Sequence, residues 1–136
     1  MRLNSRGYCV DTETQTNIPN IYAVGDFTAD IALVNIAELE GRHAVDLMFN
    51  PSPPQINYDN ISTIMFLNPE VASVGINETQ AKQKGIAYRV AKMSYEFMNR
   101  AIAMRQKEGF IKLIVSDNDE MTILGMRVLG AHASST

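Results

Sequence analysis

The sequence predicts an α+β fold in two parts, and three observations indicate it. Short apolar runs separated by polar turns come first, and one long segment with helical periodicity follows them. The second half contains several apolar runs of strand length. Between the halves, "NPSPPQINYDN" holds three of the five prolines within four positions, which suits neither a helix interior nor a central strand. We therefore predict domains at residues 1–50 and 58–136, joined by a linker at 51–57.

The composition of the 136 residues narrows the function classes. The net charge of −3 comes from interspersed acids and bases, so no basic patch for nucleic acid is expected. No segment has the run of about 20 apolar residues that is needed to span a bilayer. The start "MRLNSRGY" lacks the apolar stretch of a signal peptide. A cytoplasmic protein without a membrane partner is the expectation. Cys9 is the only cysteine, which excludes an internal disulfide and a thiolate metal cluster, and no metal site is predicted.

The first domain should contain two short strands and a helix. Residues 7–11 ("GYCVD") and 20–24 have the apolar pattern of strands bounded by turns. A helix of about four to five turns is predicted from Asp30, a candidate N-cap. Its expected buried face consists of Leu33, Ile36, Ala37, Ala44, Leu47 and Met48. Gly41 lies inside this helix at a cost of about 1 kcal/mol relative to alanine, so close packing against a neighbour is expected there.

The second domain should be built on an antiparallel sheet. Strands are predicted in 61–67, 71–75 and 86–95, and two more in 109–132, joined by the turn residues 117–119. A short helix is predicted in "NETQAKQKG", with Asn77 as N-cap, Gln80 at the third helical position and Gly85 as C-cap. Residues 94–107 are compatible with helix or loop. The final "SST" has the character of an N-cap, which predicts a further helix after it.

The run "IYAVGD" (21–26) ends at a glycine and an acid just before the predicted helix. Backbone N–H groups at a helix N-terminus attract anions and electron-rich oxygens. Because a free carboxylate there would compete with a phosphate, Asp26 makes better sense as an acceptor for ligand hydroxyls, such as those of a ribose or ribityl chain. The alternative is that Asp26 only caps the helix or a turn.

Several motifs resemble the pyridine nucleotide-disulfide oxidoreductases. "TNIPNIYAVGD" (16–26) is similar to their second flavin-binding motif, T-x-x-P-x-I-Y-A-x-G-D. "LVNIAELEG" (33–41) follows at the family's spacing, and "NPEVASVG" (68–75) resembles the signature that opens the family's dimerisation domain. "GFIKLIVSDNDEMTILGMRVLGAHAS" (109–134) looks like its later strands. Matches therefore extend over nearly the whole chain.

The resemblance implies the end of a Rossmann-like FAD-binding domain in 1–50, followed by a truncated α/β dimerisation domain. It implies FAD as a cofactor, NAD(P)H bound by parts outside this chain, and a homodimer. The flavin would contact Gly25, Asp26, Ala32, Leu33 and Val34. Asp26 would accept a hydrogen bond from a ribityl hydroxyl, and residues 32–34 would lie near the flavin ring.

The residues that carry catalysis in this family have no counterparts here. These are the redox-active cysteine pair and a His-Pro with a downstream Glu, so no catalytic residue is assigned. The G-x-G-x-x-G turn that cradles the FAD pyrophosphate in the family is not found in the sequence either. His43 and His132 are interpreted as structural or surface residues and Cys9 as a small buried hydrophobe. Glu38 and Glu40 are expected on a solvated helix face.

The function implied is that of the C-terminal portion of an FAD-dependent NAD(P)H oxidoreductase that resembles dihydrolipoamide dehydrogenase. Alone, this portion should be inactive and bind FAD weakly or not at all. Asn35 stands where many lipoamide dehydrogenases have His, so transhydrogenase, mercuric reductase and glutathione reductase relatives stay open. The alternative function is a self-association module, formed by residues 58–136, that binds no cofactor.

Overall fold

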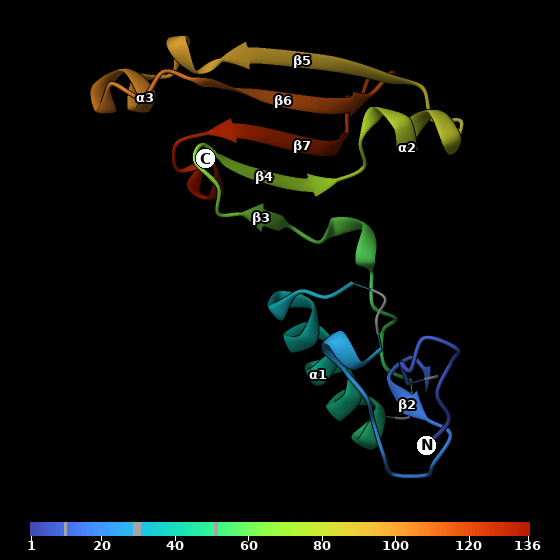
Figure 1. Ribbon diagram of the computed structural model, residues 1–136. Helices are drawn as coiled ribbons and strands as arrows, with labels where there is room; N and C mark the ends of the chain where they lie inside the picture. The colour runs from blue at the N-terminus through green and yellow to red at the C-terminus, as the bar shows by residue number, and fades with distance from the viewer. Residues whose placement is uncertain (10, 29–30, 51) are drawn as a thin grey trace. The chain divides into compact units, whose positions relative to one another are not determined.

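The computed structural model describes residues 1–9, 11–28, 31–50 and 52–136, which fall into two compact units. The first unit runs from Met1 to Tyr58 and the second from Asp59 to Thr136 (Figure 1). The predicted linker at 51–57 thus falls within the first unit.

The first unit consists of a small hairpin, a loop and one long helix. Strand β1 (Asp11–Thr12) pairs antiparallel with β2 (Gln15–Thr16), and a 3-10 helix at Gly25–Phe27 precedes α1 (Val34–Phe49). The strand predicted at 20–24 is wrong, since the described part of this run makes only an isolated bridge from Tyr22 to β2. A strand needs a continuous row of backbone partners, and the described residues of this unit do not offer one.

The strand predicted at 7–11 is also largely wrong. Cys9 makes an isolated bridge with Leu3, and only the last residue of the run belongs to β1. Val10 lies outside the described residues. Cys9 itself is buried, which confirms its interpretation as a small core residue.

Helix α1 has 16 residues, somewhat over four turns, and confirms the predicted helix. Ile36 and Ala44 are buried as predicted, whereas Met48 is exposed. The candidate N-cap Asp30 lies outside the described residues, and the N-cap position is occupied by Leu33. The close packing predicted at Gly41 is wrong, because a Cβ built there would meet no atom within 4 Å.

The second unit is a five-stranded antiparallel sheet in the order β3-β4-β7-β6-β5, which confirms the predicted antiparallel sheet (Figure 1). The strands are β3 (Thr63–Met65), β4 (Glu70–Gly75), β5 (Tyr88–Ser94), β6 (Gly109–Ser116) and β7 (Ile123–Gly130). Strands β6 and β7 form the predicted hairpin at the middle of the sheet. Strands β3 and β5 are its two edges.

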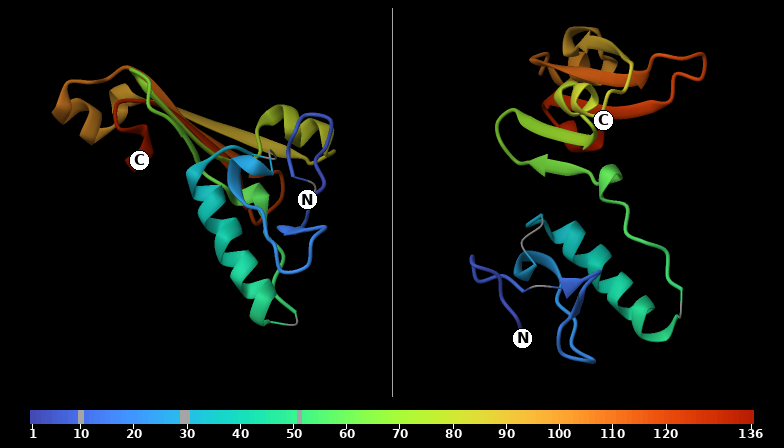
Figure 2. Two further views of the ribbon diagram at one scale, coloured as in Figure 1. Left: turned by 60° about the horizontal axis from the view of Figure 1, so that its bottom comes forward. Right: turned by 90° about the vertical axis from the view of Figure 1, so that its right-hand side faces the viewer.

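The helices of the second unit lie at opposite ends of the sheet (Figures 1 and 2). Helix α2 (Glu78–Gln83) begins with the predicted capping box between Asn77 and Gln80, and Gly85 follows it in the left-handed conformation. The ambiguous segment 94–107 contains a 3-10 helix at Tyr95–Phe97 and helix α3 (Asn99–Met104). Its two short helical pieces are separated by Met98, which is extended.

The core of the second unit lies at the α3 end of the sheet. Tyr95, Ala101, Val128 and Ala133 form a buried cluster, on which partly buried apolar residues of β4, β6 and β7 pack. Gly130 makes room for it, since a Cβ there would come within 2.2 Å of the Tyr95 ring. The final turn of the chain, a 3-10 helix at Ala133–Ser135, therefore closes this end of the core.

A row of polar side chains crosses the sheet at one level of the register. It comprises Thr63, Ser73, Arg127, Lys112 and Lys92, one from each strand. The Arg127 guanidinium donates to the carbonyls of Val74 and Gly75 on β4, at 2.7 and 2.9 Å. The Lys112 ammonium donates to Glu78 of α2 at 2.6 Å, so the row also fastens α2 to the sheet.

Two pKa values are shifted at this row, one by a hydrogen bond and one by burial. The hydrogen bond from Lys112 lowers the pKa of the Glu78 carboxyl below its ordinary value of 4.5. Burial lowers the pKa of the Arg127 guanidinium, an effect that the nearby Glu78 partly offsets.

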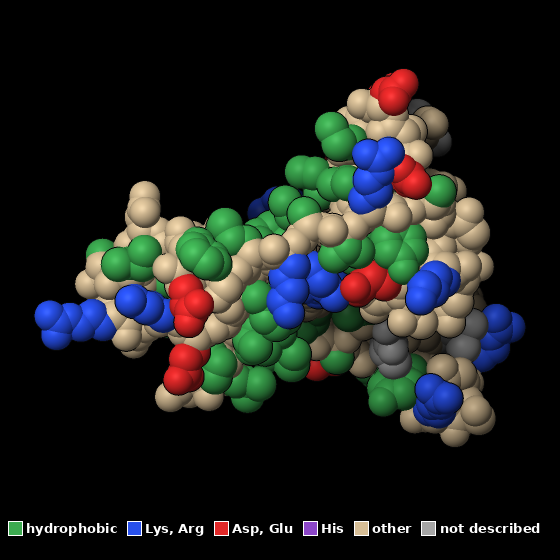
Figure 3. Space-filling view, turned by 90° about the horizontal axis from the view of Figure 1, so that it is seen from above, with side chains coloured by type: hydrophobic (Ala, Val, Ile, Leu, Met, Phe, Trp, Pro, Cys, Tyr) green, Lys and Arg blue, Asp and Glu red, His purple; other side chains and the backbone are tan. Residues whose placement is uncertain are grey.

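On the face seen in Figure 3, Lys and Arg side chains lie among hydrophobic and acidic ones.

Acid should weaken the contact between α2 and the sheet. Because the pKa of Glu78 is lower in the folded state, the stabilisation by its pair with Lys112 is complete above pH 4.5 and is lost as the pH falls through the lowered value. Urea unfolding followed from about pH 7 to about pH 3 should show a smaller loss of stability for Glu78→Gln than for the unsubstituted chain. Glu96→Gln, at an exposed glutamate, is the matched control. Equal losses in all three proteins would contradict the assignment.

Candidate functional site at the Gly25–Asp26 turn

The turn before α1 is packed tightly against the helix. Gly25 is buried and has a φ of +67°, and a Cβ built on it would come within 2.8 Å of the Ala37 Cβ on α1. Both the backbone angle and the space therefore require glycine at this position. Thr28 closes the turn, because its backbone N–H and its hydroxyl each donate to the Gly25 carbonyl at 2.9 Å.

The carboxylate of Glu40 holds this turn from the interior. Glu40 is only 2% exposed, its Oε2 accepts a hydrogen bond from the Gly25 N–H at 2.6 Å, and its Oε1 accepts one from the Tyr58 hydroxyl at 3.0 Å. The prediction of a solvated helix face is thus wrong for Glu40. It is correct for Glu38, which is exposed and pairs with Arg42. Burying a carboxylate is costly unless hydrogen-bond donors surround it, and Gly25 and Tyr58 provide them.

Asp26 lies on the outside of the turn. Its side chain is exposed, and among the described residues it makes no hydrogen bond or ion pair. Thr28, not Asp26, supplies the side-chain bond that closes the turn. The alternative in which Asp26 serves only as a cap therefore receives no support from the geometry, and its carboxylate is available to accept hydrogen bonds.

The N-terminus of α1 is exposed at its first residues. Leu33 occupies the N-cap position in an extended conformation without a side-chain hydrogen bond, and the first turn has no acidic residue. Val34, the first helical residue, is 87% exposed, and Ala32 is exposed too. The first N–H groups of a helix lack partners within it and carry partial positive charge, so this end can receive an electron-rich group.

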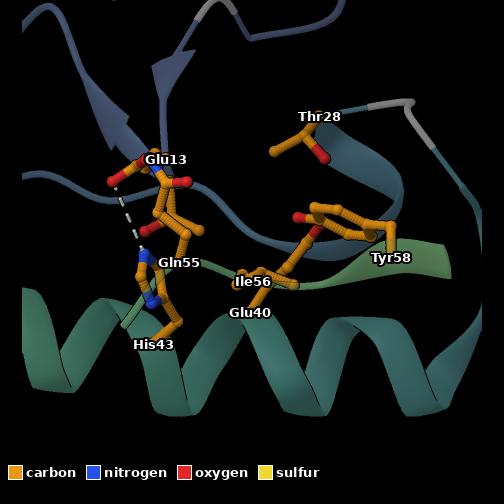
Figure 4. A pocket seen from close by; sticks show the side chains of 8 residues that line it. Glu13, Thr28, Glu40, His43, Gln55, Ile56 and Tyr58 are labelled. Carbon is orange, nitrogen blue, oxygen red and sulfur yellow. Dashed lines mark hydrogen bonds and ion pairs between the residues drawn. The ribbon is translucent and has the colours of Figure 1, made fainter. Parts of the chain in front are cut away.

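A separate pocket of about 280 Å³ lies in the first unit (Figure 4). Its lining is mostly polar and comprises Glu13, Thr14, Thr28, Glu40, His43, Gln55, Ile56 and Tyr58. The predicted site residues 25, 26 and 32–34 are not among those that line it. The pocket is therefore a feature of the hairpin, α1 and linker, distinct from the exposed side of the turn.

His43 lies inside this pocket, where it is 5% exposed. Its Nε2 faces the carboxylate of Glu13 at 4.0 Å and makes no hydrogen bond within the described residues (Figure 4). Glu13 also accepts a hydrogen bond at 3.1 Å from the side-chain amide of Gln55 in the linker. His43 is thus an interior residue, whereas His132 is exposed at the end of β7. No group of acidic, His or Cys residues suited to a metal ion occurs in the described ranges.

Comparison with known families matches residues 61–136 to the pyridine nucleotide-disulphide oxidoreductase dimerisation domain. This range is more than half of the chain. The chain belongs to this family. Residues 61–136 correspond to the dimerisation domain of that family.

Curated relatives extend the similarity into the first unit. Dihydrolipoyl dehydrogenase from Chlamydia muridarum is 38% identical over 125 residues, which cover 92% of this chain and 26% of the relative. The Bacillus subtilis enzyme of the same name is 37% identical over 91% of the chain. The one from Geobacillus stearothermophilus is 36% identical over 98% of the chain and 28% of its own length. The chain thus spans about a quarter of the relatives that it matches.

Solved structures share the fold of the whole chain. LpdA from Mycobacterium tuberculosis superposes with a TM-score of 0.87 at 25% identity, over 98% of this chain and 29% of that one. The HOCl-induced flavoprotein disulfide reductase RclA from Escherichia coli gives 0.86 at 27% identity, over 98% and 31%. No helix in the described parts of the chain has the length and apolar character required to cross a bilayer.

Two glycine substitutions in the first unit should have opposite effects on stability. Gly25→Ala adds a methyl group where φ is positive and Ala37 lies too close, so the free energy of unfolding should fall by about 1–3 kcal/mol. Gly41→Ala adds the same group to an open helix surface and should raise it by up to about 1 kcal/mol. Urea denaturation of the two variants measures both. A Gly25→Ala chain as stable as the unsubstituted one would refute the packing described for the turn.

Proposed function

We propose that the chain is the carboxyl-proximal portion of an FAD-dependent NAD(P)H oxidoreductase that resembles dihydrolipoyl dehydrogenase. It contributes one part of the flavin site and most of the subunit interface. The observation that carries the proposal is the Gly25–Asp26 turn, which ends the flavin-motif sequence and presents the exposed carboxylate of Asp26 ahead of α1. The enzyme is cytoplasmic in this proposal.

Two features of the turn fit FAD. The Asp26 carboxylate accepts hydrogen bonds only, as the hydroxyls of a ribityl chain require. The exposed N-terminus of α1 at Ala32, Leu33 and Val34 suits an electron-rich ring edge, because the N–H groups at a helix start stabilise negative charge. Bound FAD would supply the hydride and electron transfer chemistry, and Gly25 allows the backbone to pass close to α1 while Asp26 faces outward.

The second unit would contribute the contact between two subunits. It belongs to the dimerisation domain of the family, and its edge strand β3 leads into a run of exposed apolar residues, Met65, Phe66 and Leu67. Exposed apolar side chains that are contiguous are typical of protein interfaces. A homodimer is the simplest assembly that buries the same surface on both copies.

The second candidate function is a self-association module without a cofactor. The family match to the dimerisation domain alone, residues 61–136, favours it. In this reading, the first unit is a folded appendage and Asp26 is an ordinary surface residue. FAD binding distinguishes the two candidates.

The isolated chain should bind FAD weakly or not at all. The residues described for the turn supply one hydrogen-bond acceptor and one helix end, and the pyrophosphate-binding motif expected for the family is not among the 136 residues. Equilibrium dialysis or flavin fluorescence with the purified chain measures this. Tight binding of one FAD per chain would show that the absent motif is not required.

A chimeric enzyme tests the role of Asp26 directly. The matching segment of Bacillus subtilis dihydrolipoyl dehydrogenase, which is 37% identical, is replaced by this chain. FAD should bind the chimera, and Asp26→Ala should weaken its affinity by about 10- to 100-fold, since a hydrogen bond to a charged group contributes about 1.5–3 kcal/mol. Asp46→Ala, at an exposed carboxylate further along α1, is the control. Equal FAD affinities in both variants would refute the proposed contact.

The chain should self-associate through its second unit. Light scattering over a range of concentrations should give a mass above that of one chain, 15.1 kDa. Phe66→Ser removes the most exposed large apolar side chain of the run after β3 and should shift the equilibrium toward the monomer. Phe49→Ser, at a similarly exposed residue of the first unit, should leave it unchanged. A chain that stays monomeric at all concentrations would contradict the interface.

A further inference from the structure

One buried carboxylate joins two segments that are distant in the sequence. Glu40 accepts from Gly25, 15 residues earlier, and from Tyr58, 18 residues later. Gly25 belongs to the proposed flavin turn, whereas Tyr58 is the last residue of the first unit and directly follows the linker 51–57. The two oxygens of a single side chain thus connect the turn to the linker.

The two hydrogen bonds depend on each other. Glu40 is only 2% exposed, and these two bonds are the protein donors described for its carboxylate, so the loss of one leaves the other to hold a largely buried charge. Loss of the Tyr58 bond frees the carboxylate to reorient, and its other oxygen holds the Gly25 N–H. The position of the turn should therefore respond to whether the linker is docked.

The linker has a second attachment to the same unit. The Gln55 amide donates to Glu13 in the tight turn between β1 and β2, and both residues line the pocket that Glu40 and Tyr58 also line (Figure 4). Residues 55–58 therefore form a strap along this pocket, fixed at both ends by side-chain hydrogen bonds to carboxylates. The strap is thus held in one position by two specific donors, the Gln55 amide and the Tyr58 hydroxyl.

We infer that Glu40 is a positioning residue that couples the linker to the Gly25–Asp26 turn. It does not reach the ligand, and it acts on the exposed carboxylate of Asp26 through the N–H of the residue before it. The importance of this turn rests on the proposed function. By thermodynamic reciprocity, a flavin that stabilises the turn also stabilises the docked linker, and the docked linker raises the affinity for the flavin.

NMR of the 136-residue chain tests the coupling without any cofactor. The Gly25 amide proton, bound to a carboxylate at 2.6 Å, should resonate far downfield and exchange slowly. Tyr58→Phe keeps the ring and removes only the hydroxyl, so the Gly25 proton should move upfield and exchange about fivefold faster, as expected for the loss of one hydrogen bond. Tyr8→Phe, at an exposed tyrosine of the same unit, should change neither value.

Two further variants separate positioning from general destabilisation. Glu40→Gln keeps the shape but removes the charge, so it should shift the Gly25 proton further than Tyr58→Phe does. Glu38→Gln on the exposed face should leave it in place. If Tyr58→Phe leaves the Gly25 amide as Tyr8→Phe does, the coupling is refuted, whatever the behaviour of Glu40→Gln.

The chimeric enzyme distinguishes the failure of this inference from that of the proposed function. There, Tyr58→Phe should weaken FAD affinity by a smaller factor than Asp26→Ala, since it acts through Glu40. If Asp26→Ala has no effect on FAD while the Gly25 amide responds to Tyr58→Phe, the flavin contact fails and the coupling stands. If FAD affinity falls with Asp26→Ala but the Gly25 amide proton does not respond to Tyr58→Phe, the flavin contact stands and the coupling fails.

Discussion

The first unit depends on the burial of one negative charge. Glu40 gives up its hydration to lie between α1, the glycine turn and the linker, and donors from the turn and linker offset that loss. The glycine at position 25 is required because no larger residue would let the turn approach the carboxylate and Ala37 together. Asp26 is consequently held at the surface by a framework whose centre is polar.

The sequence could have revealed Glu40, although its type argued against burial. Ile36, Glu40, His43 and Ala44 follow the spacing i, i+4, i+7 and i+8, which places all four on one stripe of α1, and all four are buried. Residue type suggested a solvated face, but periodicity was the better guide. The partners of Glu40 could not be found in this way, since a contact with Tyr58 depends on the path of the linker and not on any local pattern.

The second unit was more predictable because its signals are local. The capping box of α2 needs only Asn77 and Gln80, and the β6–β7 hairpin needs only two apolar runs and a polar turn. In the first unit, residues 20–24 have the composition of a strand, but a strand forms only where backbone partners exist, and composition carries no information about partners. The role of Asp26 was predicted from a sequence motif, and that role depends on a bound ligand and not on the fold of the chain.

The edges of the sheet affect how copies of the chain can meet. Strand β5 leaves one side of its backbone open over seven residues, yet it carries Arg89 and Lys92, whose charges discourage a second strand from adding there. At the other edge, β3 has only three residues, too few to template a stable ribbon. Stacking into cross-β fibrils is thereby disfavoured at both margins. At high concentration, this architecture does not prevent amorphous aggregation through exposed apolar surface.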